Sequence, residues 1–396
     1  MAQAFDRLGE PLKLPCGIVL RNRIVKSAMS DSLGDGCGNP TAAQIRLYER
    51  WDDGGVAISI LGELQGNASV AEKPGNLVLT TDADTAMFET LAQRGGAGKA
   101  RLWVQLGHAG AMAYPPISTP KGPSALDIPG LHCAALSADE IGRLPAEFAR
   151  TASLARRLGF GGVQIHAAHG FLLSQFLSPL FNRRTDEYGG SIDNRMRLLL
   201  EVIEAVRASV GPEYPVAVKL NSSDQLEGGL QEHEALAVVA ALDRTSVDLI
   251  DISGGTYFPG ARSASDSAGG GPYFLDFAKH ARTLTSKPIM LTGGFKTRQQ
   301  AVDALDSGID VVGLARALVL DPELPGKWLA GITDNPEFPR FSAPAEGAVT
   351  AWYTMRLTAI GEDRDNQQPL DLGAAVSSYE ARDADRVVLW RKRFTT

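Results

Sequence analysis

Two histidines three residues apart, His166 and His169, are the residues of this sequence that point most clearly to chemistry. His166 ends the short apolar segment Gly162-Val163-Gln164-Ile165, so the pair falls where a strand would give way to a turn. Each neutral imidazole offers one N–H donor, and two donors together could hold one substrate oxygen. A His pair on a turn is more often a satisfied polar cluster or a helix cap, so the surrounding residues must decide between these interpretations.

Polar residues accompany three other apolar segments. Gln105 closes one of them, Lys219 lies within another, and Glu63 follows a third. An amide that both donates and accepts, a fixed cation and a carboxylate would suit an amphipathic ring system. Lys219 could instead form an ion pair inside the protein, with Glu63 or Asp251, because buried charges are normally paired.

Two glycine-containing turns suggest where a phosphate would bind. One is Thr292-Gly293-Gly294, and the other is Gly313-Leu314-Ala315-Arg316. Glycine lets the backbone approach a ligand closely, and the Arg316 guanidinium is a planar fork suited to phosphate oxygens. The sequence has neither G-x-G-x-x-G on a first strand nor G-x-x-x-x-G-K-[ST]. A Rossmann dinucleotide fold and a nucleoside triphosphatase are therefore disfavoured.

The elements that must position these residues recur along the chain as short apolar runs between amphipathic segments, a pattern typical of parallel strands with crossover helices. We predict eight strands, and eight such units favour an α/β fold of the (β/α)₈ TIM-barrel type, in which the sheet closes and leaves no edge. The two phosphate turns then follow strands seven and eight, the usual phosphate position of such barrels. A doubly wound sheet is the alternative. The predicted strands are Ile24–Ala28, Val56–Leu61, Arg101–Leu106, Gly162–His166, Pro215–Leu220, Val247–Ile252, Pro288–Leu291 and Val311–Leu314.

Seven helical patterns lie between these runs. Ser137 and Glu140 have the spacing of a capping box, and Gly159 and Gly308 stand where helices would end. The predicted helices are Ala42–Trp51, Thr85–Arg94, Asp139–Leu158, Asn194–Val210, Glu232–Leu242, Tyr273–Ser286 and Thr297–Ser307.

Two segments do not fit the repeat. The stretch Gly107–Ser137 carries five prolines and three glycines besides its first residue, so we predict a long loop excursion over the carboxyl face of the barrel, after strand 3. After about Asn335 the pattern becomes irregular. We therefore divide the chain into a barrel domain, residues 1–335, and a C-terminal extension, residues 336–396, that packs on the barrel or on a neighbouring subunit.

Composition excludes several classes of protein. The chain has 396 residues, 44% of them hydrophobic and 21% charged, and a net charge of −7, which fits a large folded core and gives no nucleic-acid footprint. Three widely spaced cysteines argue against a disulfide framework. No apolar run has the length of a signal peptide or of a membrane span, so we expect a cytoplasmic protein with no membrane partner.

Taken together, these residues resemble the Old Yellow Enzyme family of FMN-dependent NAD(P)H oxidoreductases, over about Leu14 to Pro322. Leu20–Met29 looks like the first strand of that family, Trp103–Gly110 like its third, and His166–Gly190 like its signature run. The two glycine turns are similar to its phosphate turns.

The resemblance implies FMN on the carboxyl face of the barrel, with NADPH or NADH as reductant. It places Ala28 and Met29 beside the isoalloxazine, Gln105 and Lys219 on its pyrimidine ring, and Gly293, Gly294, Ala315 and Arg316 at the phosphate. Glu63 is expected near the cofactor. His166 and His169 would grip the carbonyl or nitro oxygen of an electrophilic alkene. A lysine near N1 and C2=O would stabilise the negative charge of the reduced flavin.

One departure from the family pattern concerns the proton donor. Most alkene-reducing members have tyrosine where this chain has Phe171, which has no proton to give. Water, Tyr257, Tyr114 or Tyr188 could take over that role. Phe171, Tyr257 and Ser30 are expected in the substrate pocket, and Ser30 stands where one branch of the family has a redox-sensitive cysteine.

Three other functions stay open at this point. The flavin could run oxidatively, in a dehydrogenase or demethylase. His108, His166 and His169 could instead bind a metal for hydrolysis, and a flavin-binding protein without catalytic activity is also conceivable. The partner expected from the resemblance is a small molecule, and a homo-oligomer is compatible with the sequence.

Overall fold

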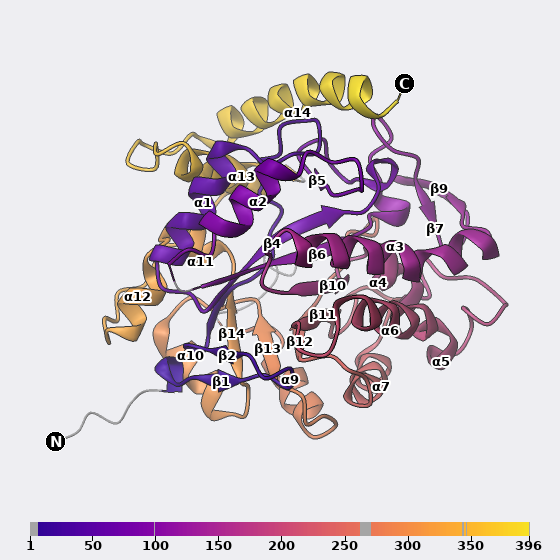
Figure 1. Ribbon diagram of the computed structural model, residues 1–396, viewed down its shortest axis with the longest axis horizontal. Helices are drawn as coiled ribbons and strands as arrows, with labels where there is room; N and C mark the ends of the chain where they lie inside the picture. The colour runs from indigo at the N-terminus through magenta and orange to yellow at the C-terminus, as the bar shows by residue number, and fades with distance from the viewer. Residues whose placement is uncertain (1–6, 99, 262–270, 343, 346, 396) are drawn as a thin grey trace.

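Eight parallel strands form a closed barrel in the computed structural model, which describes residues 7–98, 100–261, 271–342, 344–345 and 347–395 (Figure 1). The strand β3 pairs with both β14 and β4, and this pairing closes the sheet. The barrel and all eight predicted strand positions are confirmed, and the doubly wound sheet is excluded. The barrel strands are β3 (Ile24–Lys26), β4 (Ile58–Gln65), β6 (Arg101–Gly107), β10 (Val163–Ala167), β11 (Val216–Asn221), β12 (Leu249–Ser253), β13 (Ile289–Thr292) and β14 (Val311–Leu314).

Helices surround the barrel, and their ends agree with the sequence signals. Glu140 N donates to Ser137 Oγ at 3.2 Å and Ser137 N donates to Glu140 Oε2 at 2.9 Å, which confirms the capping box. Gly159 and Gly308 follow helices with φ of +91° and +100°, a conformation that favours glycine. The helices of the barrel region are α1 (Ala42–Asp53), α2 (Thr85–Arg94), α3 (Ala138–Arg157), α4 (Leu172–Leu177), α5 (Ile192–Arg195), α6 (Arg197–Val210), α7 (Glu232–Asp243), α9 (Leu275–Arg282), α10 (Arg298–Asp306), α11 (Arg316–Leu320) and α12 (Leu324–Leu329), with short 3₁₀ turns at Arg7–Gly9 and Ala68–Val70.

The amino-terminal half of the barrel interior is apolar. Trp103 is its largest side chain, and Gly162 makes room for it, because a Cβ at Gly162 would lie 2.6 Å from Trp103 Cε2. A hairpin of β1 (Leu12–Lys13) and β2 (Val19–Leu20) adds Leu14 and Leu20 to this cluster and so packs against this end of the barrel. The other buried members are Val25, Ala57, Ile58, Ile60, Ala217, Leu249, Met290 and Val311.

The excursion after β6 is more ordered than predicted. It begins with the 3₁₀ turn η3 (Gly110–Met112) and forms a small sheet of β7 (Lys121–Gly122), β8 (Leu126–Ile128) and β9 (Leu131–Ala135). Its apolar residues pack on Phe181 and Phe258, which follow β10 and β12, so the segment does lie at the carboxyl end of the barrel. The position of the excursion was predicted, but its three strands were not, because prolines and glycines interrupt the sequence pattern between them.

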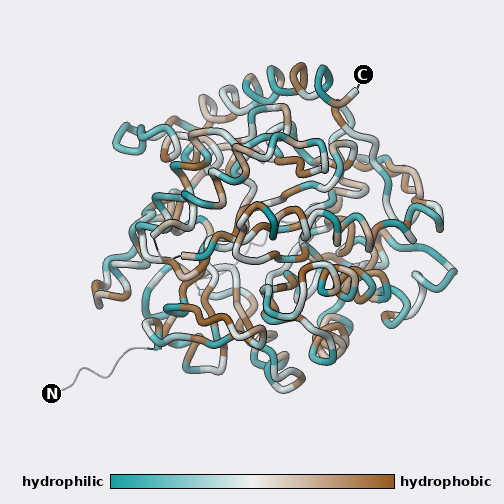
Figure 2. Tube along the Cα trace, in the orientation of Figure 1, coloured by the Kyte–Doolittle hydropathy of each residue, from teal (hydrophilic) through white to brown (hydrophobic). Residues whose placement is uncertain are grey.

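The prediction of an irregular C-terminal tail was also wrong. Residues after 347 form α13 (Ala348–Gly361) and α14 (Leu372–Phe394), which lie side by side at one edge of the molecule (Figure 1). Trp352 donates its indole N–H to Leu370 O at 2.8 Å, and Trp390 is buried against Val78 and Ile117. Figure 2 shows hydrophilic and hydrophobic residues alternating along α14 without a continuous apolar run. Both helices therefore pack on this chain's own barrel region.

The short strand β5 (Leu77–Val78) extends the sheet beside β4, and Val78 on it contacts the C-terminal helix region. None of the helices in the described parts of the chain combines the length and the apolar composition that crossing a membrane requires.

Candidate active site

Polar side chains replace apolar ones in the carboxyl-terminal half of the barrel interior. They alternate along the strands, because every second residue of a strand faces the same side. Register places His166 beside Lys219, and Lys219 beside Asp251, on three neighbouring strands. The buried polar residues of this half are Ser27, Gln105, Gln164, His166, Lys219, Asn221, Asp251, Ser253 and Thr292.

An ion pair lies at the centre of this polar layer. Lys219 Nζ is 3.0 Å from Asp251 Oδ2, and both side chains are almost fully buried, at 1% and 0% exposure. Asp251 also accepts hydrogen bonds from Gln164 Nε2 at 2.9 Å and from Thr292 Oγ1 at 2.6 Å. Of the two partners considered for Lys219, Asp251 is in contact with it.

Gln105 is tied into the same network. Its Nε2 donates to Gln164 Oε1 at 2.7 Å, and it stands at the carboxyl end of the interior as predicted. Glu63 lies within β4, and its side chain falls outside the described part of the structure. The sequence analysis missed Gln164, although a polar residue inside an otherwise apolar strand was a usable signal.

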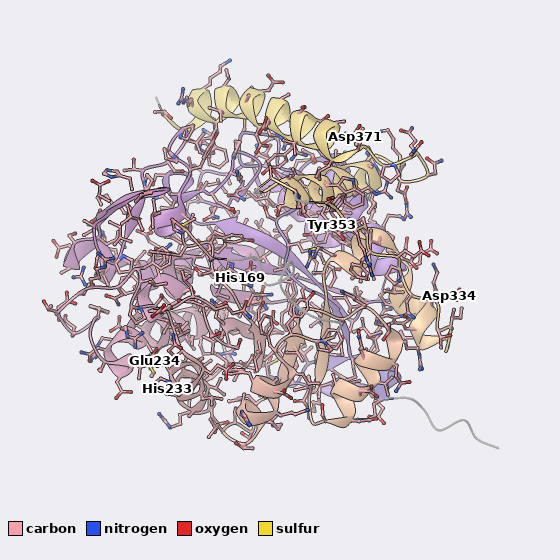
Figure 3. The ribbon with its side chains drawn as sticks, turned by 180° about the vertical axis from the view of Figure 1, so that it is seen from behind. His169, His233, Glu234, Asp334, Tyr353 and Asp371 are labelled. Atoms are coloured by element: carbon pink, nitrogen blue, oxygen red, sulfur yellow. The ribbon has the colours of Figure 1, made fainter. Side chains whose placement is uncertain are left out.

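The two predicted histidines come together at the carboxyl end of β10. Their ring centroids are 5.4 Å apart and their planes are 79° apart. His166 lies on β10, and His169, labelled in Figure 3, lies on the turn that follows. His169 N donates to Asn221 Oδ1 at 3.0 Å, and its Nε2 is 2.9 Å from Ser253 Oγ. Within the described residues, the buried Nδ1 of His166 has no hydrogen-bond partner.

The backbone of His169 is held in an uncommon conformation. Its φ is +61°, a left-handed value that costs a residue other than glycine roughly 1–3 kcal/mol. Asn221 and Ser253 hold the residue there, and Tyr257 N donates to His169 O at 3.1 Å from the other side. The surrounding structure therefore fixes the direction of this imidazole.

Burial keeps both histidines neutral. It lowers the pKa of His169 to about 3, and the Lys219 charge adds to this effect. Burial also lowers the pKa of His166 well below its ordinary value, with further contributions from His169 and Lys219. At neutral pH each ring therefore carries one N–H, which can donate to an oxygen.

Phe171 packs on the histidine pair. Its side chain is buried, and its ring centroid is 4.7 Å from that of His166. The ring of Tyr257 lies 6.0 Å from Phe171 and is 60% exposed. Tyr188 instead bonds to Glu201 at 3.1 Å, away from the pair.

Tyr114 belongs to another part of the molecule. It lies under the Lys73 ammonium, 5.2 Å from its ring centre, in the cluster around Trp390. Of the three tyrosines considered as replacement acids, Tyr257 is therefore the one beside Phe171.

The two glycine turns lie side by side, because Thr292 of β13 pairs with Gly313 of β14. Gly293 and Gly294 have φ of +124° and +83°, and a Cβ at Gly294 would meet Gly271 O at 2.1 Å. A Cβ at Gly313 would lie 2.3 Å from Thr292 Oγ1. These positions admit only glycine without displacement of the backbone or its neighbours.

Arg316 opens α11 directly after Ala315, and an aromatic ring from the C-terminal extension supports it. The centre of the Tyr353 ring is 5.5 Å from the Arg316 guanidinium carbon. Figure 3 shows Tyr353 on the C-terminal helices, on the side of the molecule where His169 is also visible. The sequence analysis did not assign Tyr353 to the site, because α13 itself was missed.

Ala28, Met29 and Ser30 follow β3 at the same end of the barrel and are half-buried. The chain there runs against β4, since a Cβ at Gly62 would lie 2.0 Å from Met29 O. These half-buried residues lie beside the polar interior, the glycine pair and Arg316. Together, these groups provide the donor set that a phosphate-bearing aromatic cofactor requires.

His108 does not join the other two histidines. Its Nδ1 accepts a hydrogen bond from Gly110 N at 3.0 Å, and burial lowers its pKa to about 4. Among the residues that the structure describes, no group of three His, Cys, Asp or Glu side chains is placed to hold a metal ion. The metal-dependent hydrolase therefore has no ligand cluster here to support it.

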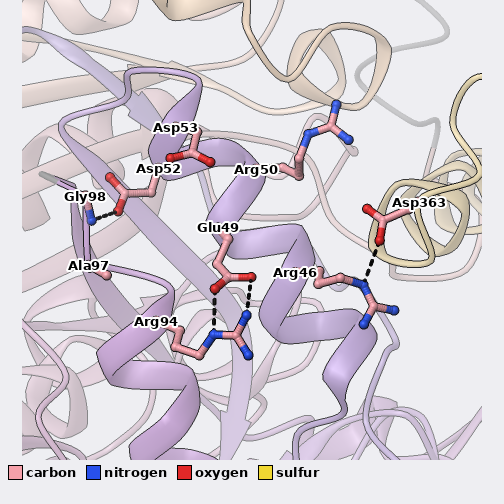
Figure 4. Close-up of a pocket in the computed structure, with 9 residues that line it drawn as sticks. All are labelled: Arg46, Glu49, Arg50, Asp52, Asp53, Arg94, Ala97, Gly98 and Asp363. Carbon is pink, nitrogen blue, oxygen red and sulfur yellow. Dashed lines mark hydrogen bonds and ion pairs between the residues drawn. The ribbon is translucent and has the colours of Figure 1, made fainter.

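A cavity of about 370 Å³ lies at the opposite end, near the starts of β4 and β6 (Figure 4). Two of its arginines form ion pairs: Arg94 Nε is 2.6 Å from Glu49 Oε1, and Arg46 Nε is 3.2 Å from Asp363 Oδ2. In a barrel of this type, residues at the amino ends of the strands serve stability. We therefore place the active site at the carboxyl ends.

Known proteins share this architecture. The sequence profile of the NADH:flavin oxidoreductase / NADH oxidase family matches residues 7–335. An NADH-dependent flavin oxidoreductase of Neonectria sp. (strain DH2) is 34% identical over 356 residues, which cover 80% of this chain and 46% of that protein. Another of Hypocrea jecorina (strain QM6a) is 33% identical, covering 80% and 87%. The Old Yellow Enzyme homologue from Zymomonas mobilis superposes with a TM-score of 0.72 at 26% identity, covering 82% and 92%.

Proposed function

The chain belongs to the NADH:flavin oxidoreductase / NADH oxidase family and is an FMN-dependent NAD(P)H oxidoreductase, and on that premise we propose that it reduces the C=C bond of electrophilic alkenes. The observation that carries the proposal is the pair of neutral imidazoles 5.4 Å apart at the mouth of the barrel. Two N–H donors at one oxygen suit a carbonyl or nitro group that gains negative charge during the reaction.

The residues of the carboxyl end fit FMN. Gly293, Gly294 and the Ala315 and Arg316 backbone would receive the phosphate, with the Arg316 fork as a cation. Gln105 and Lys219 would contact the pyrimidine ring, and Ala28 and Met29 would lie beside the isoalloxazine. Ser30, Phe171 and Tyr257 would line the substrate pocket.

Bound FMN supplies hydride transfer from NADH or NADPH to the β-carbon of the alkene. The histidines act on the substrate itself. His166 and His169 donate to its oxygen and so stabilise the enolate-like or nitronate-like charge that forms there. Because both stay neutral, these donors do not themselves change charge across the neutral pH range.

Phe171 restricts the substrates that the enzyme turns over. An enolate must receive a proton at its α-carbon, and the buried phenyl ring has none to give. A nitronate is stable enough to leave and take its proton from water. We therefore infer a preference for nitroalkenes over simple enones.

Anaerobic stopped-flow spectroscopy tests the proposal. The flavin is reduced with NADH or NADPH, and the protein is then mixed with 2-cyclohexenone or with a nitroalkene. We expect the nitroalkene to reoxidise the flavin much faster. Phe171→Tyr should speed reoxidation by cyclohexenone about 10²-fold or more, the range for a positioned general acid, and leave the nitroalkene reaction nearly unchanged.

Phe171→Leu is the matched control, since it alters packing on His166 without adding a proton. Rapid reoxidation by cyclohexenone in the unaltered protein, abolished by Tyr257→Phe, would show that Tyr257 supplies the proton. A purified protein that has no flavin spectrum after incubation with FMN would overturn the proposal.

A further inference from the structure

We infer that Asp251 is a positioning residue of the flavin site, which neutralises Lys219 and, through Gln164, fixes the orientation of the Gln105 amide. The inference rests on the proposed function, because Lys219 and Gln105 are the side chains assigned there to the pyrimidine ring. Asp251 itself acts through these residues, from its position beside Lys219 on the neighbouring strand.

The positive charge of Lys219 is compensated by the carboxylate of Asp251. Lys219 Nζ is 3.0 Å from Asp251 Oδ2, and both side chains are almost fully buried. A buried cation whose partner is removed is strongly unfavourable, so the carboxylate determines whether the lysine presents a net charge to its surroundings. The Lys219 charge does reach the site, since it contributes to the lowered pKa of both His166 and His169.

The orientation of the amides follows from the same carboxylate. An ionised carboxylate only accepts hydrogen bonds, so Gln164 must turn its NH₂ group towards Asp251, at 2.9 Å. The carbonyl of Gln164 then faces Gln105 and accepts from its NH₂ group at 2.7 Å. The oxygen and nitrogen ends of a glutamine amide are nearly equivalent in shape, so without the carboxylate either end could face its neighbour.

This chain of contacts leaves a definite set of groups on Gln105 for a ligand. One amide hydrogen is used by Gln164, and the carbonyl oxygen stays available as an acceptor. Thr292 holds the other carboxylate oxygen at 2.6 Å and in turn lies 2.9 Å from Ser27, so Asp251 is itself fixed from both sides. A ring with both N–H and C=O groups would be recognised in a single orientation.

The charge that each substitution removes determines whether reduced or oxidised FMN is bound more tightly than before. A reduced flavin that carries negative charge is stabilised by a net positive charge nearby and destabilised by a net negative one. Removal of the Asp251 carboxylate should therefore strengthen binding of reduced FMN relative to oxidised FMN. Removal of the Lys219 ammonium should do the opposite, and removal of both should largely restore the original ratio.

The experiment measures the two-electron potential of the FMN-loaded full chain by equilibration with a reference dye, for Asp251→Asn, Lys219→Met and the double variant. We expect Asp251→Asn to raise the ratio of reduced to oxidised FMN affinity at least tenfold, which is about 30 mV for a two-electron couple. Lys219→Met should lower the ratio by a similar factor, and the double variant should lie between the two.

Asp248→Asn is the matched control. Asp248 lies just before the same strand and is buried, and it pairs with Arg207 at 2.6 Å and accepts from Val216 N at 2.9 Å at the amino-terminal end. The control loses a buried ion pair like that of Asp251, so it should lower stability. Its potential should stay at the value of the unaltered protein.

Gln164→Met tests the orientation of Gln105 without a change in charge and without relying on the folding of an Asp251 variant. FMN affinity should fall about tenfold in both redox states, while the potential stays constant. An unchanged FMN affinity in Gln164→Met, or an unchanged potential in FMN-loaded Asp251→Asn, would overturn this inference. Either result would leave the proposed function standing. Failure of the unaltered chain to bind FMN would overturn the proposed function and the inference with it.

Discussion

The two halves of the barrel interior use the same strands in opposite ways. On β12, Leu249 faces inward at the amino end among apolar side chains, and Asp251 faces inward two residues later among hydrogen-bonding partners. On β6, Trp103 and Gln105 stand in the same relation. A rise of about 7 Å along a strand therefore separates a packed core from a polar site.

This difference teaches that stability and chemistry are separable in this barrel. The apolar half needs only close packing, whereas the polar half needs each buried donor and acceptor to be paired. Substitutions in one half should consequently leave the property of the other half intact, and the predictions that follow test this separation.

Trp103→Ala should have the largest effect, and on stability. Loss of a fully buried indole leaves a cavity and should lower the free energy of unfolding by about 3–5 kcal/mol, measured by urea denaturation. FMN affinity of the folded fraction should not change. Trp103→Phe is the control: among described residues the buried indole N–H has no hydrogen-bond partner, so this variant should lose much less. A large fall in FMN affinity in either variant would contradict the separation.

His166→Ala should reduce activity more than stability, the reverse of Trp103→Ala. Removal of one donor to a developing oxyanion lowers kcat/KM by about 10²–10³-fold in comparable sites, so we expect a loss of this size with a nitroalkene. The urea midpoint should move less than in Trp103→Ala, since the imidazole is smaller than an indole and the buried His166 Nδ1 makes no hydrogen bond within the described structure. A stability loss as large as that of Trp103→Ala would mean that the histidine serves the core.

The polar half should also make stability depend on pH. Burial lowers the pKa of His169 to about 3, and it lowers that of His166 as well, so the unfolded chain binds more protons than the folded chain below pH 6.5. The contribution of these two histidines to the free energy of unfolding should therefore be level above about pH 7, and His108, whose pKa burial lowers to about 4, acts in the same direction. The contribution should fall as the pH drops below 6.5, by at most about 1.4 kcal/mol per pH unit for each histidine.

Urea denaturation of the cofactor-free chain between pH 5 and 8 measures this slope. His169→Asn removes one titrating group and should reduce the slope, whereas Trp103→Phe should leave it as it is. An equal slope in His169→Asn would show that other groups cause the pH dependence.

Much of the barrel was predictable because its strands carry a strong local signal. Runs such as Val163–Ile165 are apolar and short and lie between helical patterns, so their number and order alone indicate a barrel. The histidine pair and the glycine turns were predictable because strand ends meet at one face. Each such signal lies within a few neighbouring residues.

The missed residues act over long distances in the sequence. Asn221 and Ser253 contact His169 from positions 52 and 84 residues later in the chain, and no local sequence pattern indicates such contacts. The helix α13 was missed because apolar residues are buried on nearly all its sides, so it has no amphipathic stripe. With α13 unrecognised, the contact of Tyr353 with Arg316 could not be foreseen.

The last helix also has a consequence for how the protein is made. Arg386 of α14 donates to Ser32 O, and these two residues are 354 positions apart. At 5–20 residues per second, a ribosome adds Arg386 about 20–70 s after Ser32. Throughout that interval Ser32 and Gly36, in the segment after β3, lack the helix that packs on them. This segment is therefore among the last regions of the nascent chain to be completed.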